Sequence, residues 1–270
     1  MPQSKSSLRY LLLPRGRRDT ASVGDEFPRE DAFDEDYLYF YEELLTPERT
    51  AADVELVWRL LELSPGLELL DLACGHGRIA NALAERGVRV TGLDATPLFL
   101  DLARADAAER GLDVEYVEGD MRSIPWRERF DRVLCWFTSF GYFDDPDNQK
   151  TLAEFARVLR PGGQLLLETM HHDGFVRGFI PAPGATVAER GDDTLIDVTT
   201  FDSVRGRVET DRTVHRDGRV RRSHHSIRVP TVPEFDEWLA AAGFSERHYS
   251  ERGGRPLRYD SRRLVVTATK

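Results

Sequence analysis

Residues 68–78, which read Glu-Leu-Leu-Asp-Leu-Ala-Cys-Gly-His-Gly-Arg, join an apolar stretch to a carboxylate and then to a turn of small residues. Gly75 and Gly77 have no Cβ atom, so the backbone of this turn can come into contact with a ligand. A helical pattern begins directly after the turn. A strand, a glycine turn and a helix in this order are typical of a site that holds a nucleoside cofactor.

Two further carboxylates end strand-like segments. Asp94 lies about 20 residues after the turn, where a carboxylate can accept hydrogen bonds from both hydroxyl groups of a ribose. Asp120 follows the next such segment and is suited to accept a hydrogen bond from the amino group of an adenine. Residues 75–80, Gly-His-Gly-Arg-Ile-Ala, also satisfy the glycine pattern of dinucleotide sites. A nicotinamide site has less use for Asp120, which therefore favours a different adenosine cofactor.

The elements that must position these residues alternate along the chain. Strand patterns at 69–72, 88–93, 114–118, 132–137 and 164–169 are separated by mostly helical patterns, and Thr96-Pro97 and Pro161-Gly162-Gly163 mark helix boundaries. This alternation predicts an α/β protein with a doubly wound, mostly parallel sheet. The carboxyl ends of its strands then share one edge, where ligands bind.

The alternation breaks after Thr169. Polar and apolar residues alternate over 194–201, 207–215 and 219–229, which predicts an antiparallel β meander inserted after the fifth strand. A capping box at Thr231–Glu234 begins another helix, and strands at 245–249 and 263–268 complete a seven-stranded sheet. We therefore expect a flexible arm over 1–30, a Rossmann-like domain over 31–170 and 229–270 with helices that form an N-terminal lid, and a substrate-side cap over 171–228.

Composition limits the function classes. The chain has 270 residues and a net charge of −10, so it lacks the positive field that nucleic-acid binding needs. Four arginines between Arg9 and Arg18 are the local exception, and we assign them to the N-terminal arm. No apolar stretch approaches the roughly 20 residues of a membrane span, so a cytoplasmic protein is expected. The two cysteines are expected to be buried apolar residues without chemistry.

Five motifs in order carry a family resemblance. They are Asp71-x-x-x-Gly75-x-Gly77, Asp94, residues 119–122 (Gly-Asp-Met-Arg), residues 130–134 and residues 159–163. Together they resemble the motifs of class I S-adenosylmethionine (SAM)-dependent methyltransferases, over roughly residues 36–270. The segment 137–143 is similar to that of a bacterial small-molecule subgroup whose layout is that of the amino-sugar N-methyltransferases. The usual first glycine of the loop is Ala73 here, and we expect that residue to stay in the β region.

The resemblance implies roles for the cofactor residues. Asp71, Ala73, Gly75 and Gly77 would surround the methionine portion of SAM. Asp94, with Ala95 beside it, would bind the ribose, and Asp120 and Met121 the adenine. Phe137 would line the sulfonium, because cations bind favourably to aromatic faces. Tyr37 and Tyr41 belong to an aromatic segment that would close over the cofactor and contact its carboxylate.

Methyl transfer also needs an oriented acceptor and, for a protonated acceptor, a group that takes its proton. Glu168, His171 and His172 follow the fifth strand at the ligand-binding edge and are the predicted proton acceptors. Phe140 and Tyr142 are the predicted substrate contacts. No metal site is predicted, because neighbouring histidines point apart and nothing else marks one.

The sequence thus predicts a SAM-dependent methyltransferase of a small-molecule acceptor, with S-adenosylhomocysteine as the product, acting in secondary metabolism (natural product biosynthesis). Nitrogen or oxygen is preferred over carbon as the acceptor atom. Two alternatives remain at this point: a SAM-binding cyclase or regulatory protein that does not methylate, and an NAD(P)-dependent oxidoreductase. Neither nucleic acid nor membrane is an expected partner.

Overall fold

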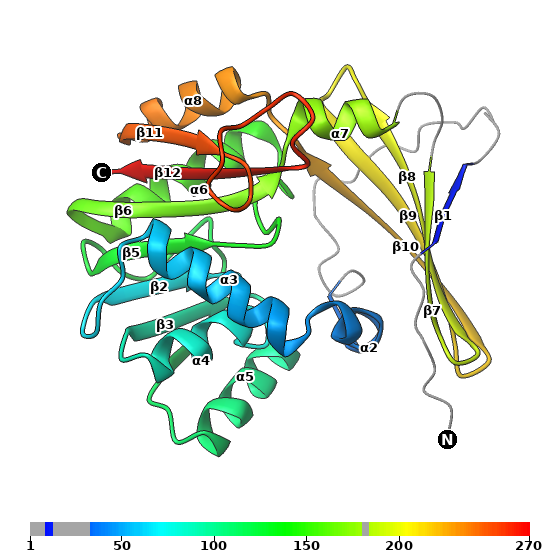
Figure 1. Ribbon diagram of the computed structural model, residues 1–270, viewed down its shortest axis with the longest axis horizontal. Helices are drawn as coiled ribbons and strands as arrows, with labels where there is room; N and C mark the ends of the chain where they lie inside the picture. Colours follow the sequence, from blue (N-terminus) through cyan, green and yellow to red (C-terminus); the bar gives the residue numbers. More distant parts are fainter. Residues whose placement is uncertain (1–8, 13–32, 180–183) are drawn as a thin grey trace.

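The computed structural model describes residues 9–12, 33–179 and 184–270, and its larger sheet has seven strands. These strands lie in the order β11-β12-β6-β5-β2-β3-β4 (Figure 1). Their bounds are β2 (Glu68–Leu72), β3 (Arg89–Asp94), β4 (Glu115–Glu118), β5 (Phe130–Cys135), β6 (Leu159–Met170), β11 (Ser245–Ser250) and β12 (Arg263–Thr269). The strands β4, β3, β2, β5 and β6 are parallel, and β12 is antiparallel to both of its neighbours. The predicted doubly wound α/β sheet is confirmed.

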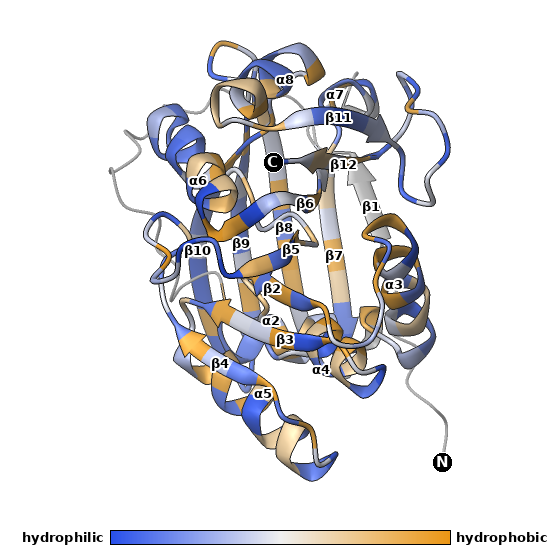
Figure 2. Ribbon diagram, turned by 90° about the vertical axis from the view of Figure 1, so that its left-hand side faces the viewer, coloured by the Kyte–Doolittle hydropathy of each residue, from blue (hydrophilic) through white to orange (hydrophobic). Residues whose placement is uncertain are grey.

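Helices cover both faces of this sheet. α3 (Pro47–Leu60), α4 (Arg78–Glu85) and α5 (Pro97–Glu109) pack on one face, and α6 (Asp145–Val158) and α8 (Val232–Ala241) on the other. Successive strand residues enter opposite cores, so Leu69 packs under α3 while Leu70 packs against α6. Helices such as α3 and α5 carry both hydrophobic and hydrophilic residues (Figure 2). None of the helices among the described residues combines the length and hydropathy needed to span a membrane.

The helix boundaries follow the capping chemistry of the sequence. The Thr46 side chain accepts a hydrogen bond from the Arg49 amide at 3.3 Å and begins α3. Thr231 and Glu234 form the predicted capping box of α8. α5 differs, because the amide of Thr96 donates to the Asp94 carboxylate at 2.8 Å and the threonine hydroxyl makes no cap. The start of α5 is therefore tied to a site residue.

A second, antiparallel sheet stands beside the first in the order β1-β7-β8-β9-β10 (Figure 1). Its strands are β1 (Arg9–Leu12), β7 (Gly184–Arg190), β8 (Asp193–Asp202), β9 (Arg207–Arg216) and β10 (Arg219–Arg228). The last three are the predicted meander. β1 was not predicted: residues 9–12 lie within the expected flexible arm, yet they pair with β7. The rest of that arm lies outside the described residues.

Two short helices lie on the side of the second sheet that faces the first. α2 (Glu35–Tyr41), followed by the turn Glu42–Leu44, packs at one end through Phe40 against Ala188, Leu195 and Val214. At the other end α7 (His172–Phe179) places Phe175 beside Phe201. We call this side the inner face.

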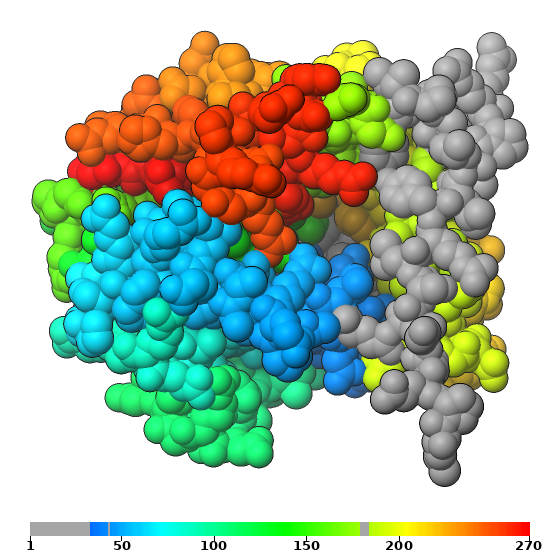
Figure 3. Space-filling view, in the orientation of Figure 1, coloured from blue at the N-terminus to red at the C-terminus, as the bar shows by residue number. Residues whose placement is uncertain are grey.

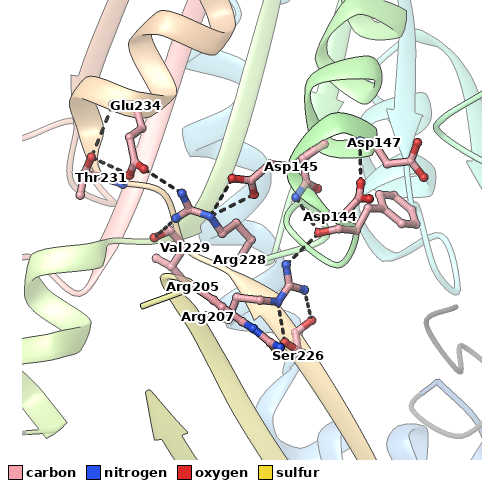
Figure 4. Close-up of polar contacts among 12 residues, drawn as sticks. Asp144, Asp145, Asp147, Arg205, Arg207, Ser226, Arg228, Val229, Thr231 and Glu234 are labelled. Atoms are coloured by element: carbon pink, nitrogen blue, oxygen red, sulfur yellow. Dashed lines mark hydrogen bonds and ion pairs between the residues drawn. The ribbon is translucent and has the colours of Figure 1, made fainter. Parts of the chain in front are cut away.

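The return from the second sheet to the first is fixed by Arg228 (Figure 4). This buried guanidinium pairs with Asp145 of α6 at 3.0 Å and with Glu234 of α8 at 2.8 Å. Nearby, Arg207 donates to the carbonyl oxygen of Phe143 at 2.9 Å. The junction therefore connects the antiparallel sheet to the loop between β5 and α6.

The loop that precedes β12 lies against α3 (Figure 3). Arg59 donates to the Gly253 carbonyl at 3.0 Å, and Arg252 pairs with Asp53, a buried carboxylate of α3. Asp53 also pairs with Arg78, the first residue of α4, at 2.9 Å. These contacts fix α3 relative to the start of α4 and to the loop before β12.

Candidate functional site

A cavity of about 160 Å³ opens at the carboxyl ends of the parallel strands. The glycine turn, the ends of β3 to β5 and the N-terminal aromatic segment all contribute to it. Of the predicted site residues, its lining includes Tyr37, Asp71, Ala73, Gly75, Asp94, Ala95, Asp120, Met121, Phe137 and Tyr142. The fold therefore brings most of the predicted cofactor residues to one place.

The two glycines of the turn have different surroundings. Gly75 has a φ of +56°, and an added Cβ would meet only the Phe99 ring at 3.9 Å. Gly77 has a φ of +78°, and its Cβ would overlap the Tyr116 hydroxyl at 2.4 Å. Gly77 is thus required by backbone geometry and by packing behind the turn, and the expectation that it admits a ligand is not supported.

Ala73 differs from its expected conformation. Its φ is +53°, in the left-handed region, whereas the sequence interpretation placed it in the β region. The error has a physical reason: the chain must turn sharply between Asp71 at the end of β2 and the start of α4. A Cβ atom in this conformation costs about 1 kcal/mol relative to glycine.

Asp94 supports the turn as well as the cavity. One carboxylate oxygen accepts the amide hydrogen of Gly75 at 2.8 Å, and the other accepts that of Thr96 at 2.8 Å. Burial raises the pKa of this carboxyl, and the hydrogen bonds from these amides oppose that rise. Asp94 consequently fixes the turn relative to the start of α5.

Asp71 is a buried acid at the floor of the cavity, only 3% exposed. Burial, with the nearby Asp94 carboxylate as a second cause, raises its pKa to about 7. A carboxyl group in this state is stabilised in its charged form by a cation. The floor therefore favours a positively charged ligand group.

A positive corner lies beside this acidic floor. Arg78 lines the cavity and pairs with Asp53, which Arg252 also contacts. Arg49 places its guanidinium 5.2 Å from the centre of the Phe137 ring, and burial together with the nearby Arg252 lowers its pKa. Three arginines thus surround one aspartate, which suits an anionic ligand group. The sequence interpretation missed Arg49 and Arg78 because their grouping depends on how α3 meets α4.

Asp120 and Met121 line the end of the cavity beyond β4. The Asp120 carboxylate also binds the guanidinium of Arg122, with a shortest distance of 2.7 Å. Arg122 in turn lies 4.3 Å from the ring centre of Phe143, another lining residue. These contacts fix the side chain of Asp120 at the wall of the cavity.

Aromatic rings cover the cavity from the N-terminal side. Phe33 and Tyr37 lie edge to face at 5.4 Å and both line it, together with Phe99. Tyr37 also stacks on Tyr41 at 4.3 Å. Tyr41 itself is absent from the lining: its hydroxyl oxygen accepts a hydrogen bond from Arg212 of β9 at 3.3 Å. Tyr41 therefore lies behind Tyr37 and outside the cavity lining.

Glu168 does not have the geometry of a proton acceptor. It is fully buried, and the Arg263 guanidinium binds both of its carboxylate oxygens, at 2.5 and 2.7 Å. It also accepts the amide hydrogen of Phe137 at 3.0 Å. Phe137 and Thr138 both have a φ of 62°, which is costly for a β-branched residue. We therefore assign Glu168 to holding this strained turn, which lines the cavity.

The two histidines also lie outside the lining of the cavity. His171 is buried, and its Nδ1 lies 2.8 Å from the Ser261 carbonyl oxygen. His172 keeps 22% of its side chain exposed and places Nδ1 2.9 Å from the Asp173 carboxylate. Its ring meets Phe201 edge to face at 5.6 Å. Of the three predicted proton acceptors, only His172 retains an accessible imidazole.

The two predicted substrate contacts separate in the structure. Phe140 is 1% exposed and stacks on Phe235 in the core at 5.3 Å, so it is a packing residue. Tyr142 lines the cavity, and burial raises the pKa of its hydroxyl, with the charge of Arg212 acting in the opposite direction. Tyr142 therefore lies between the cavity and the antiparallel sheet.

Comparison with known proteins gives the family of the central segment. Residues 69–163 match the model of a methyltransferase domain. The demethylmenaquinone methyltransferase of Thermus thermophilus is 39% identical over 121 residues, which cover 42% of this chain and 54% of that protein. The first curated relatives, from mycobacteria, are 34% identical over 40% of their length. The aligned segments thus span about half, or less, of the length of these curated relatives.

Solved structures match over more of the chain. A SAM-dependent methyltransferase from Clostridium acetobutylicum has a TM-score of 0.73 at 16% identity, covering 87% of this chain and 97% of that one. SAM-bound CalS10, an amino pentose methyltransferase from Micromonospora echinaspora, has a TM-score of 0.62 at 24% identity, with 87% and 97% covered. At these identities the likeness concerns the fold alone.

The residues of the cavity fit SAM as cofactor. The acidic floor suits its amino group, the positive corner its carboxylate, and Asp94 its ribose. Trp136 lines the cavity, and its buried Nε1 has no hydrogen-bond partner among the described residues, as expected of a wall completed by a ligand. Within the same residues no cluster of three or more His, Cys, Asp or Glu side chains could hold a metal ion. Residues 69–163 therefore match a methyltransferase domain, and the cavity at their strand ends fits S-adenosylmethionine.

Proposed function

We propose that the protein transfers a methyl group from SAM to a nitrogen or oxygen atom of a small-molecule acceptor. The observation that carries the proposal is the pairing of opposite charges in one cavity: buried Asp71 and Asp94 at the floor and Arg78 at the corner. SAM bound there supplies an electrophilic methyl group on a sulfonium. A dinucleotide has no amino acid portion to match this arrangement.

The chain's own residues then orient the cofactor and exclude water. Asp94 binds the ribose hydroxyls, Asp71 the amino group and Arg78 the carboxylate, while Asp120 accepts a hydrogen bond from the adenine amino group. Phe33 and Tyr37 form an aromatic cover, which removes water from the reacting atoms. Phe137, held in place by Glu168, presents its backbone and ring at the methyl position.

The acceptor enters from the side of the antiparallel sheet, where Tyr142, Thr138 and Ser139 line the cavity. When the acceptor atom forms its bond to carbon it loses a proton. We assign that proton to His172 by way of water, because His172 lies outside the cavity lining and a hydrogen bond from Nδ1 to Asp173 leaves Nε2 as the acceptor. His171 and Glu168 do not take the proton, and their buried hydrogen bonds stabilise the end of β6.

Secondary metabolism, a cytoplasmic location and the absence of nucleic-acid or membrane partners stay predictions. The net charge of −10 supports the last of these. Among the similar proteins, one is a demethylmenaquinone methyltransferase and one an amino pentose methyltransferase. The proposal places the acceptor of this chain among such small molecules.

Calorimetry with S-adenosylhomocysteine and with NADPH tests the cofactor, and labelled methyl transfer to a panel of amines and phenols tests the reaction. We expect Asp94→Ala to weaken S-adenosylhomocysteine binding by about 1–3 kcal/mol, because two charge-assisted hydrogen bonds are lost. Asp101→Ala, at an exposed site of α5, is the control and should bind normally. Binding of NADPH without S-adenosylhomocysteine would refute the proposal.

A further inference from the structure

The loop between β5 and α6 is attached to the antiparallel sheet at two points. The amide of Arg228 donates to the carbonyl oxygen of Gly141 at 2.7 Å. The guanidinium of Arg207 on β9 donates to the carbonyl oxygen of Phe143 at 2.9 Å. The buried side chain of Asn148 on α6 donates to the same oxygen at 2.8 Å. The backbone at Phe143 is therefore held both by a strand of the inserted sheet and by a helix that covers the large sheet.

The Arg207 side chain is partly buried and forms no ion pair within the part of the chain that the structure describes. Its other hydrogen bonds go to the hydroxyl and carbonyl oxygens of Ser226, at 2.6 and 3.1 Å (Figure 4). Burial lowers the pKa of this guanidinium, so its charge is costly here. An apolar side chain would fill the space without that cost, whereas only a donor can hold the Phe143 carbonyl. This contrast indicates a positioning role rather than a stabilising one.

The Phe143 side chain extends from this fixed backbone to the cofactor cavity. Its ring lines the cavity, and the centre of the ring lies 4.3 Å from the guanidinium carbon of Arg122, a cation–π distance. Arg122 binds both carboxylate oxygens of Asp120, at 3.1 and 2.7 Å, and also pairs with Asp147 of α6 at 2.6 Å. A single guanidinium thus separates the Phe143 ring from the carboxylate that we assign to the adenine.

Selection of adenine depends on where that carboxylate lies. The amino group of adenine donates to Asp120, whereas the carbonyl oxygen of hypoxanthine at the same position would place two acceptors against each other. A binding site rejects such an analogue strongly only when its hydrogen-bonding group keeps its place. A carboxylate that is free to turn away would accommodate both bases.

We infer that Arg207 is a positioning residue for the adenine portion of the cofactor. It holds the backbone of Phe143, whose ring in turn keeps Arg122 and Asp120 in the arrangement that selects adenine. The inserted sheet therefore contributes to recognition of the methyl donor, at the opposite end of the cofactor from its methionine portion. This inference rests on the adenine role of Asp120 in the proposed function.

The test is calorimetry of the full chain with S-adenosylhomocysteine and with S-inosylhomocysteine, in which hypoxanthine replaces adenine. The wild type should bind the adenine compound about tenfold or more tightly than the hypoxanthine compound. Arg207→Met and Arg207→Gln should each lower this preference at least threefold, and Phe143→Leu should do the same. Arg205→Met, at an exposed position in the turn before β9, is the matched control and should keep the preference of the wild type.

The ratio of the two affinities separates positioning from stability. A smaller folded fraction would weaken both ligands by the same factor and leave their ratio unchanged, and thermal unfolding measures that fraction. If both Arg207 variants keep the preference of the wild type, the inference is wrong and the proposed function stands. If the wild type itself binds the two compounds equally, the adenine role of Asp120 is wrong and the inference falls with it. No binding of S-adenosylhomocysteine to the wild type would instead remove the proposed function.

Discussion

Asp71 and Asp94 place two carboxyl groups close together in a buried floor. An aspartic acid has a pKa of about 3.9 in an unfolded chain, whereas burial raises that of Asp71 to about 7 in the folded one. The folded state therefore holds this proton more tightly, and Asp71 makes the free protein less stable as the pH rises from about 4 to 7. A bound cation relieves this cost.

The expected consequence is a pH-dependent affinity. S-adenosylhomocysteine, which keeps the amino group, should bind about tenfold more tightly at pH 8 than at pH 6, because Asp71, with a pKa of about 7, is mostly protonated at pH 6 and mostly ionised at pH 8. Calorimetry at both pH values measures this ratio. Asp71→Asn should bind S-adenosylhomocysteine weakly, with equal affinity at pH 6 and pH 8. If the affinities of this variant still differ tenfold between the two pH values, Asp71 is not the source of the pH dependence.

Ala73 offers a second prediction at this scale. Its positive φ suits glycine, so Ala73→Gly should stabilise the protein by about 0.5–1 kcal/mol, after allowance for the greater entropy of glycine in the unfolded chain. Chemical denaturation measures this difference. Ala82→Gly, in the middle of α4, is the control and should destabilise by a similar amount. A destabilised Ala73→Gly variant would contradict the assigned conformation.

Among the elements, the turn after β5 is held by side chains of two neighbouring strands. Phe137 and Thr138 keep positive φ angles because Glu168 on β6 and Arg263 on β12 hold them, the latter through a 2.5 Å hydrogen bond to the Thr138 hydroxyl. Three strands thus cooperate to shape one turn of the cavity. Without these contacts the turn has no reason to keep a strained backbone.

Glu168→Gln should therefore lower both stability and cofactor affinity. Loss of the buried charge leaves Arg263 poorly paired, a change that typically costs about 3 kcal/mol or more of unfolding free energy. Thermal unfolding and S-adenosylhomocysteine calorimetry measure the two effects. Glu154→Gln, which breaks the ion pair with Arg157 away from the cavity, should change stability only. Normal affinity in Glu168→Gln would argue against its positioning role.

The elements also show what the sequence could predict. The strands of the large sheet, the three strands of the meander and the capping box follow local patterns, and the acids at the ends of β2 and β3 were placed correctly by those patterns. Glu168, by contrast, lies within β6, and its partner Arg263 is 95 residues away along the chain, so no local pattern predicts their ion pair. β1 was missed for the same reason, since a four-residue strand has too little pattern without its partner β7.

At the scale of the whole molecule, ion pairs attach α2 and the turn that follows it to the antiparallel sheet. Asp36 pairs with Arg216 at 2.8 Å and with Arg221 at 2.8 Å, and Glu42 pairs with Arg190 at 2.9 Å. On the same helix Tyr37 lines the cavity. The cover of the cofactor site is thus held by the sheet that we assign to the acceptor.

Asp36→Asn should consequently weaken S-adenosylhomocysteine binding several-fold, although Asp36 does not line the cavity. At high salt the difference in affinity between the wild type and Asp36→Asn should be smaller, because salt weakens the ion pairs of Asp36 in the wild type. Calorimetry at low and high ionic strength gives both values. Glu35→Gln removes the same charge from the neighbouring exposed position and should bind normally. Equal affinities for wild type and Asp36→Asn would show that α2 is held by apolar contacts alone.

The junction at Arg228 has a consequence for how this protein diverges. The inserted strands leave after β6 and return at α8, and the contacts of Arg228 with α6 and α8 fix the return point. Between these anchors the insertion can change in evolution without moving the carboxylates on β2 and β3. Relatives that share residues 69–163 can therefore share a methyl donor while differing in what they methylate.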